Sequence, residues 1–165
     1  MLSGETAIGE FPIDAVQVMQ RIMTHTEQHL RHRPSRWFDE SEDQKIRVSQ
    51  AVIRSAASVA QNIDAGLVAI ATGNGDAALL KSKQRDFIPT VAFSHQLEII
   101  RRMNLFWGIK PVFLEVAVAD QDLVAVAQEW AKENFDLSEG DRIVFVVDTE
   151  AWPGVNDMLL VSEVH

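Results

Sequence analysis

The sequence predicts an α/β protein: a three-layer sandwich with a five-stranded, mostly parallel sheet, helices on both faces and an N-terminal helical arm. Short apolar runs alternate with segments of helical periodicity, which is typical of strand–helix–strand units around a parallel sheet. Residues 143–147 (IVFVV) are all apolar, as expected of a strand buried on both faces. Only a loop separates them from the last strand, at 158–164, so that strand should run antiparallel to its neighbour.

The composition is that of an ordinary globular domain, since 165 residues with 47% apolar and 24% charged residues support a sizeable core. The net charge of −9 argues against a nucleic-acid partner, because phosphate backbones require clustered Lys and Arg. The absence of cysteine excludes disulfides, thiolate catalysis and Cys-bound metals. No apolar run approaches the ~20 residues of a membrane span, and the N-terminus lacks a signal-peptide pattern. We therefore expect a cytoplasmic protein without a membrane partner.

The N-terminal part of the chain predicts a helical arm. Residues 1–11 have the composition of a loop, and Pro12 suits the first position of a helix. Apolar residues then recur at helical spacing over 12–32, and Pro34 ends that segment. The expected organisation is an arm, a linker and an α/β domain, at 1–33, 34–41 and 42–165.

The α/β domain should open with a helix, because Ser41 begins the capping-box pattern S-E-D-Q and an apolar stripe continues to about Asn62. Ser94 is expected to cap a later helix. Basic residues in the last turn and Gly or Pro beyond it mark the other helix ends. The further helices are expected at 76–85, 95–106 and 119–134, and the strands at 67–71, 89–93, 111–116, 143–147 and 158–164.

A glycine-rich loop links the first strand to the helix that follows it. This glycine loop consists of Thr72, Gly73, Asn74, Gly75 and Asp76. Backbone N–H groups of such a loop and the N-terminus of the next helix point at the space above the strand, where a phosphate or another anion can bind. Ligands of open α/β sheets bind at this end of the strands. The alternative is a plain turn that needs a positive φ, since neither GxGxxG nor GxxxxGK[ST] is present.

Three histidines fall on one face of the first helix. His25, His29 and His32 lie at i, i+4 and i+7, a spacing that could bind zinc or nickel. The alternative is a polar helix face with incidental histidines, because no further ligand is evident.

Charged residues near the proposed loop have ordinary interpretations as well. The basic ones are Lys81, Lys83, Arg85, Arg101 and Arg102, and the acidic ones around strand 143–147 are Glu139, Asp141, Asp148 and Glu150. The former suit solvated helix ends, and the latter suit solvated turns, although paired carboxylates can also hold Mg²⁺ or exchange protons. No serine has a histidine partner that the spacing supports. From the residues alone, this is an α/β domain with a candidate anion loop and no visible catalytic machinery.

Several segments agree in order and spacing with one known family over nearly all 165 residues. They are M-L-S-G-E-T-A-x-G at 1–9, the helix and strand at 51–72, S-K-x-R-x-x-x-P at 82–89, L-x-W-G-I-x-P-V at 105–112 and G-D-R-I-V at 140–144. Together they resemble pyruvate kinase. The resemblance implies that the arm is the last helix of the catalytic barrel and that the rest is the C-terminal α/β domain. That domain has five strands, the last antiparallel.

The resemblance also implies a function. Pyruvate kinase transfers phosphate from phosphoenolpyruvate to ADP in glycolysis, using Mg²⁺ and K⁺ in its barrel, and the corresponding residues would precede Met1. Ser3 would be a remnant of the active-site segment. We therefore expect a regulatory and oligomerisation domain that forms homo-oligomers, has no cofactor of its own and is inactive alone. The alternatives are a free-standing phosphate- or nucleotide-binding module and a non-catalytic partner subunit.

In many members of the family the C-terminal domain binds a sugar-phosphate activator between the glycine loop and a loop at 148–157. The resemblance places Thr72, Gly73, Asn74, Gly75, Asp76, Trp152 and Gly154 at this effector site. Asn74 stands where relatives have Ser, and Asp76 stands at a cationic or hydroxyl position. The second loop carries acids where a phosphate clamp needs Gly, Arg and Ser or Thr. Because these carboxylates would repel a bisphosphate, a monophosphate, a nucleotide or no ligand remains open.

Overall fold

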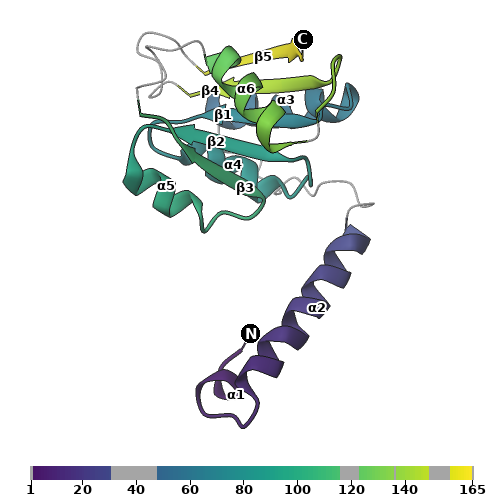
Figure 1. Ribbon diagram of the computed structural model, residues 1–165, viewed down its shortest axis with the longest axis vertical. Helices are drawn as coiled ribbons and strands as arrows, with labels where there is room; N and C mark the ends of the chain where they lie inside the picture. Colours follow the sequence, from purple (N-terminus) through teal and green to yellow (C-terminus); the bar gives the residue numbers. More distant parts are fainter. Residues whose placement is uncertain (1, 31–47, 116–122, 136, 149–156, 165) are drawn as a thin grey trace, which may run out of the picture. The chain divides into compact units, whose positions relative to one another are not determined.

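The computed structural model describes residues 2–30, 48–115, 123–135, 137–148 and 157–164 (Figure 1). The chain divides into two compact units, an N-terminal unit (Met1–Arg36) and an α/β unit (Trp37–His165). Each is described by itself below.

The N-terminal unit contains α1 (Gly4–Ala7) and α2 (Pro12–Leu30). The helix expected from Pro12 is therefore present, whereas the loop expected over 1–11 is wrong at α1. Local side-chain bonds favour this single turn: the Ser3 N–H donates to Glu5 Oε2 (2.9 Å), and Thr6 Oγ1 donates to the Ser3 carbonyl (3.1 Å). None of the residues of α2 is buried.

The α/β unit is built on one sheet in the order β3-β2-β1-β4-β5. Its strands are β1 (Leu67–Ala71), β2 (Thr90–Ser94), β3 (Ile109–Phe113), β4 (Arg142–Val147) and β5 (Met158–Glu163). The first four are mutually parallel, and β5 pairs with β4 in antiparallel register. The predicted mixed sheet is thus confirmed, including the direction of its last strand.

Helices cover both faces of this sheet, which gives the three predicted layers (Figure 1). The helices are α3 (Val48–Asn62), α4 (Asp76–Gln84), α5 (Leu97–Met103) and α6 (Leu123–Asn134). Because side chains alternate along a strand, Val68 and Ile70 of β1 pack with α3, α4 and α5, while Leu67 and Ala69 pack with α6. Small residues such as Ala56 let α3 approach the sheet closely.

Two element boundaries differ from the prediction for identifiable reasons. β3 begins at Ile109, two residues early, and Pro111 lies inside it; an edge strand tolerates proline because one side of it needs no backbone donor. Ser94 is the last residue of β2 rather than a helix cap. Its hydroxyl accepts the N–H of Gln96, the N-cap residue directly before α5.

Candidate functional site at the switch point of the sheet

The strand order places the switch point of the sheet between the carboxyl ends of β1 and β4. From β1 the chain proceeds through α4 to β2 on one side, whereas β4 lies on the other side of β1. Such a reversal of strand order is the point where ligands bind in open α/β sheets. Thr72 directly follows β1, and Asp148 directly follows β4. Because Ala71 is in register with Val147, the sheet brings Thr72 and Asp148 together although they are 76 positions apart.

Asp148 binds the start of the glycine loop. The hydroxyl of Thr72 donates to Asp148 Oδ2, and the Gly73 N–H donates to Asp148 Oδ1 at 3.3 Å. The two side chains belong to buried residues, since Thr72 is 1% and Asp148 8% exposed. The Asp148 N–H continues the sheet by donating to the Ala71 carbonyl (3.0 Å). The Gly73 N–H, near the start of the glycine loop, is therefore bound by a carboxylate of the chain itself.

The other polar groups of the glycine loop also bind one another. The Gly75 N–H donates to Thr72 Oγ1 (2.8 Å), so this hydroxyl donates to Asp148 and accepts from Gly75. The Asp76 N–H donates to Asn74 Oδ1 (2.8 Å). Gly75 has φ +80°, as the plain-turn interpretation requires. The N–H groups of Gly73, Gly75 and Asp76 thus pair with side-chain oxygens of this chain.

Arg102 of α5 lies at the rim of the glycine loop. Its guanidinium donates to the Asn74 carbonyl and lies 3.7 Å from Asp76 Oδ1. Both side chains of the ion pair are exposed, Arg102 by 47% and Asp76 by 67%. The sequence favoured a solvated helix end for Arg102, and its position near the loop in sequence was the one signal for this contact.

Two of the other candidate basic residues bind elsewhere. Lys81 Nζ lies 2.6 Å from both carboxylate oxygens of Asp86, and the side chains are 2% and 4% exposed. Burial lowers the pKa of Lys81, and the charge of Asp86 opposes that effect. Arg85 stacks on the ring of Trp107 at 4.4 Å. The sequence did not predict the buried ion pair of Lys81 and Asp86, because a lysine in the last turn of a helix is typically solvated.

The remaining predicted site residues are spread over the chain. Ser3 lies in the N-terminal unit, beside Glu5, whose pKa is lowered by hydrogen bonds from its own backbone N–H and from that of Ser3. Trp152 and Gly154 lie outside the described residues. The effector role of the glycine loop therefore stays a prediction.

The histidine face of α2 is exposed to solvent. His25 and His29 have ring centroids 4.6 Å apart, and His29 Nδ1 lies 2.9 Å from the His25 carbonyl oxygen; His32 is outside the described residues. Within the described ranges, no three His, Asp or Glu side chains come together as metal ligands.

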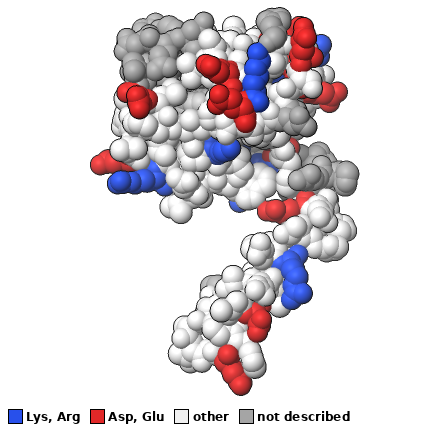
Figure 2. Space-filling model, viewed as in Figure 1, with Lys and Arg blue, Asp and Glu red and all other residues white. Residues whose placement is uncertain are grey.

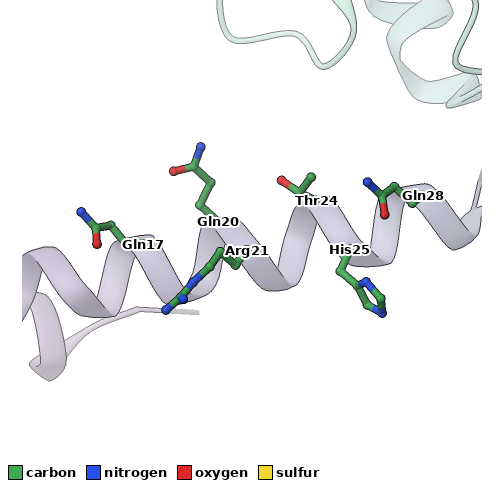
Figure 3. A pocket seen from close by; sticks show the side chains of 6 residues that line it. All are labelled: Gln17, Gln20, Arg21, Thr24, His25 and Gln28. Carbon is green, nitrogen blue, oxygen red and sulfur yellow. The ribbon is translucent and has the colours of Figure 1, made fainter.

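A shallow hollow also lies along α2 (Figure 3). Its lining comes from this single helix and consists of Gln17, Gln20, Arg21, Thr24, His25 and Gln28. In Figure 3 the side chains of Gln20 and Thr24 point to one side of the helix, and those of Arg21 and His25 to the other. Because these side chains diverge, we do not regard the hollow as an active site.

The charges on one face of the molecule are mixed in sign. On the face drawn in Figure 2, Lys and Arg side chains are interspersed with Asp and Glu rather than gathered into a basic stripe. Among the described helices, none combines the length and the apolarity that a membrane crossing requires.

The five-stranded sheet and the helices on its two faces define a three-layer α/β domain. Residues 50–162 match the family model of the pyruvate kinase alpha/beta domain. The chain is 30% identical over 165 residues to pyruvate kinase 2 of Synechocystis sp., a match that covers 99% of this chain and 27% of the relative. It is 33% identical over 148 residues to the pyruvate kinase of Agrobacterium vitis, with 88% and 30% covered.

Solved structures agree with these matches. A crystal structure of a pyruvate kinase from Cryptosporidium parvum has a TM-score of 0.76 to this chain at 28% identity, and covers all of this chain and 33% of that one. The pyruvate kinase of the same organism in complex with ADP gives a TM-score of 0.72 at 29% identity. The chain belongs to the pyruvate kinase family, as the resemblance predicted. It spans about a third of the length of the relatives it matches.

Proposed function

We propose that this chain is the regulatory and oligomerisation domain of a pyruvate kinase in the cytoplasm, and that it has no phosphotransferase activity by itself. The observation that carries the proposal is the hydrogen-bonded junction at the switch point. There Thr72 after β1, Asp148 after β4 and Arg102 on α5 all bind within or to the glycine loop. A loop held by several elements can pass a local change to each of them, which suits regulation.

The state of the buried charged groups supports the non-catalytic part of the proposal. A catalytic acid, base or nucleophile must face the reacting atoms. Asp86 instead binds Lys81, and Asp148 binds Thr72 and Gly73. The Mg²⁺ and K⁺ that pyruvate kinases require would be held by parts of the family enzyme other than this domain.

The test is to incubate the purified chain with phosphoenolpyruvate, ADP, Mg²⁺ and K⁺ and to measure pyruvate. We expect no formation above the rate without protein. Pyruvate released at an enzymatic rate would contradict the proposal.

The exposed edge of β5 supports self-association. Met158, Leu160 and Val161 are 36%, 38% and 42% exposed on this edge strand. The opposite edge, β3, carries Lys110 and Pro111, which discourage pairing with another strand. The apolar strand β5 therefore fits a second copy of the chain better than β3 does.

A charge on β5 tests this assembly. Leu160→Lys should shift the chain to monomers in light scattering coupled to size exclusion, whereas the same charge at Phe113, on the protected edge β3, should leave the oligomer intact. Equal effects of Leu160→Lys and Phe113→Lys, with circular dichroism unchanged, would argue against the β5 edge.

A second candidate is a free-standing module that binds a phosphate or a nucleotide. The position of the glycine loop before α4, with Arg102 beside it, favours this reading. Thermal-shift measurements with sugar phosphates, nucleotides and inorganic phosphate distinguish the two candidates. Stabilisation of a monomeric chain by one of these anions would favour the binding module.

A third candidate is a non-catalytic partner subunit of a complete pyruvate kinase. Mixing the chain with such an enzyme and measuring a joint complex by size exclusion would identify it.

A further inference from the structure

Asn74 and Gly75 form the single Asn-Gly pair of the sequence. Such a pair is prone to deamidation, because glycine has no Cβ that would hinder the attack of its backbone nitrogen on the asparagine side chain. The residues after the other asparagines all carry a Cβ; they are Ile63, Leu105, Phe135 and Asp157. The sequence thus makes Asn74 the most reactive asparagine, and the structure of the loop decides when it reacts.

Deamidation of Asn74 needs no reagent other than water. The Gly75 nitrogen loses its proton and attacks Asn74 Cγ; the new C–N bond closes a succinimide ring, the Cγ–Nδ2 bond breaks and ammonia leaves. Water then opens the ring. Addition of water at Cγ gives aspartate, whereas addition at the main-chain carbonyl carbon gives isoaspartate, in which the peptide link runs through the side chain.

The structure activates the carbonyl group that is attacked. Asn74 is only partly buried, so water can reach its side chain. Its Oδ1 accepts the Asp76 N–H at 2.8 Å. A donor in this position stabilises the negative charge that develops on the oxygen when the nitrogen attacks. The asparagine side chain is therefore ready for the reaction in the folded chain.

The attacking nitrogen, in contrast, is protected. The Gly75 N–H donates to Thr72 Oγ1 at 2.8 Å. Gly75 is buried and Thr72 is 1% exposed, so the proton that must leave is held in a hydrogen bond away from solvent. Water can remove this proton only after a local opening of the loop. The hydroxyl of Thr72 thus controls whether Gly75 can react.

We propose that Asn74 is a deamidation site gated by Thr72: it is protected while the Gly75 N–H binds the Thr72 hydroxyl, and it is modified when that bond opens. This inference goes beyond the proposed function and does not depend on it, because the reaction requires neither an effector nor a partner subunit.

The modification changes the glycine loop permanently. The aspartate product adds a negative charge at the start of α4. The isoaspartate product inserts the Cβ of residue 74 into the main chain directly before Gly75, which displaces the Gly75 N–H from the Thr72 hydroxyl. Because the lost ammonia is not replaced, the site records each opening of the loop that leads to reaction.

The test incubates the full chain at neutral pH and follows the mass of its peptides, since deamidation replaces NH₂ by OH. In enough urea to unfold the chain, Asn74 should react faster than Asn62, Asn104 and Asn134 in the same digest. Without urea, Asn74 should react about tenfold more slowly or less than in urea, because the bond at Gly75 must open first.

Hydrogen exchange gives an independent measure of the same opening. Deamidation and exchange both require a free Gly75 N–H, so the factor by which folding slows deamidation should match the protection of the Gly75 amide against exchange. This comparison needs no variant and is made on the original chain.

Two variants at Thr72 form a matched pair. Thr72→Val removes the acceptor of the Gly75 N–H and should raise the deamidation rate of the folded chain about tenfold. Thr72→Ser keeps a hydroxyl and should react as slowly as the original chain. In urea all three chains should react at one rate, because Thr72 takes no part in the chemistry. Circular dichroism shows whether each variant is folded.

Three results would overturn the proposal. The gate is wrong if Asn74 reacts as fast in the folded original chain as in urea, or if a folded Thr72→Val chain reacts as slowly as the original. The site itself is wrong if the unfolded chain deamidates no faster at Asn74 than at the other three asparagines. Should Thr72→Val not fold, the match between deamidation and Gly75 exchange in the original chain decides the question.

Discussion

Asp86 and Asp148 are two buried carboxylates at opposite ends of the parallel strands. Asp86 lies before β2, at the end where the parallel strands begin, and binds the ammonium group of Lys81 at 2.6 Å. Asp148 lies after β4, where the parallel strands end, and binds a hydroxyl and a backbone amide. The first pairing joins two full charges that support each other, whereas the second uses neutral donors that an external ligand can also use. The difference separates a structural pair from a candidate regulatory contact.

The largest effect should come from leaving Asp86 without its cation. Lys81→Met should lower the free energy of unfolding by about 3–5 kcal/mol, because a buried charge then has no counter-charge. Urea unfolding measures this loss. The double variant Lys81→Met/Asp86→Asn keeps an acceptor for the Ile88 N–H, which Asp86 binds at 3.2 Å, and should recover most of the stability. If the double variant instead lost as much stability as Lys81→Met and Asp86→Asn together, the ion-pair interpretation would be contradicted.

The same pair should show a distinct dependence on pH. Burial lowers the folded-state pKa of Lys81 below its ordinary 10.5. Between that lowered pKa and 10.5 the unfolded chain binds more protons than the folded chain, so the contribution of Lys81 to the free energy of unfolding rises with pH. The difference in stability between the original chain and Lys81→Met/Asp86→Asn should therefore move in favour of the original chain as pH rises through this window. A shift in the other direction would mean that Asp86 outweighs burial.

The contact between Thr72 and Asp148, at the other end of the strands, should have a smaller effect on stability. Asp148→Ala and Thr72→Val should each lower the free energy of unfolding by about 1–3 kcal/mol, because each leaves a buried polar group without a partner. The double variant should lose less than the sum of the two, with a coupling of about 0.5–3 kcal/mol. Strict additivity in urea unfolding would show that the two side chains act independently.

The fold could be predicted further than the site, for a physical reason. Apolar runs such as 143–147 and the glycine loop are local signals, and they located the strands and the candidate loop. The contact of Asp148 with Thr72 depends instead on β1 lying next to β4, a pairing of residues 76 positions apart. Strand neighbours of this kind follow from packing of the whole sheet, so the sequence predicted acidic residues near the site but not which of them binds the glycine loop.

The buried ion pair was missed for a different reason. Arg85 ends α4 in the left-handed conformation with φ +53°, and this reversal brings Asp86 back to Lys81 five positions earlier. A left-handed arginine is unusual for a side chain with a Cβ, so the sequence suggested a helix that simply ends in solvated basic residues. The pair could have been found only by asking which acid follows that helix end.

The rim of the glycine loop should give the smallest effect. Gly75→Ala places a Cβ 2.9 Å from Arg102 Nη2 and 3.2 Å from Ile99 Cγ2 at φ +80°, whereas Gly108→Ala at φ +70° meets nothing within 4 Å. Both should lower the free energy of unfolding by about 1–2 kcal/mol through backbone strain. Gly75→Ala should lose a little more, because Arg102 must leave the Asn74 carbonyl.

Arg102→Ala separates these two contributions. Alone it should change stability by less than about 1 kcal/mol, since its ion pair with Asp76 is exposed. Combined with Gly75→Ala it should reduce the excess over Gly108→Ala, because the added methyl group then has no guanidinium to displace and only the contact with Ile99 remains. If the full excess persists without Arg102, the cost of Gly75→Ala comes from the contact with Ile99 and not from the guanidinium. The hydrogen bonds of Asp148 would then be the contacts that distinguish this end of the strands from the other end, where Lys81 and Asp86 form their ion pair.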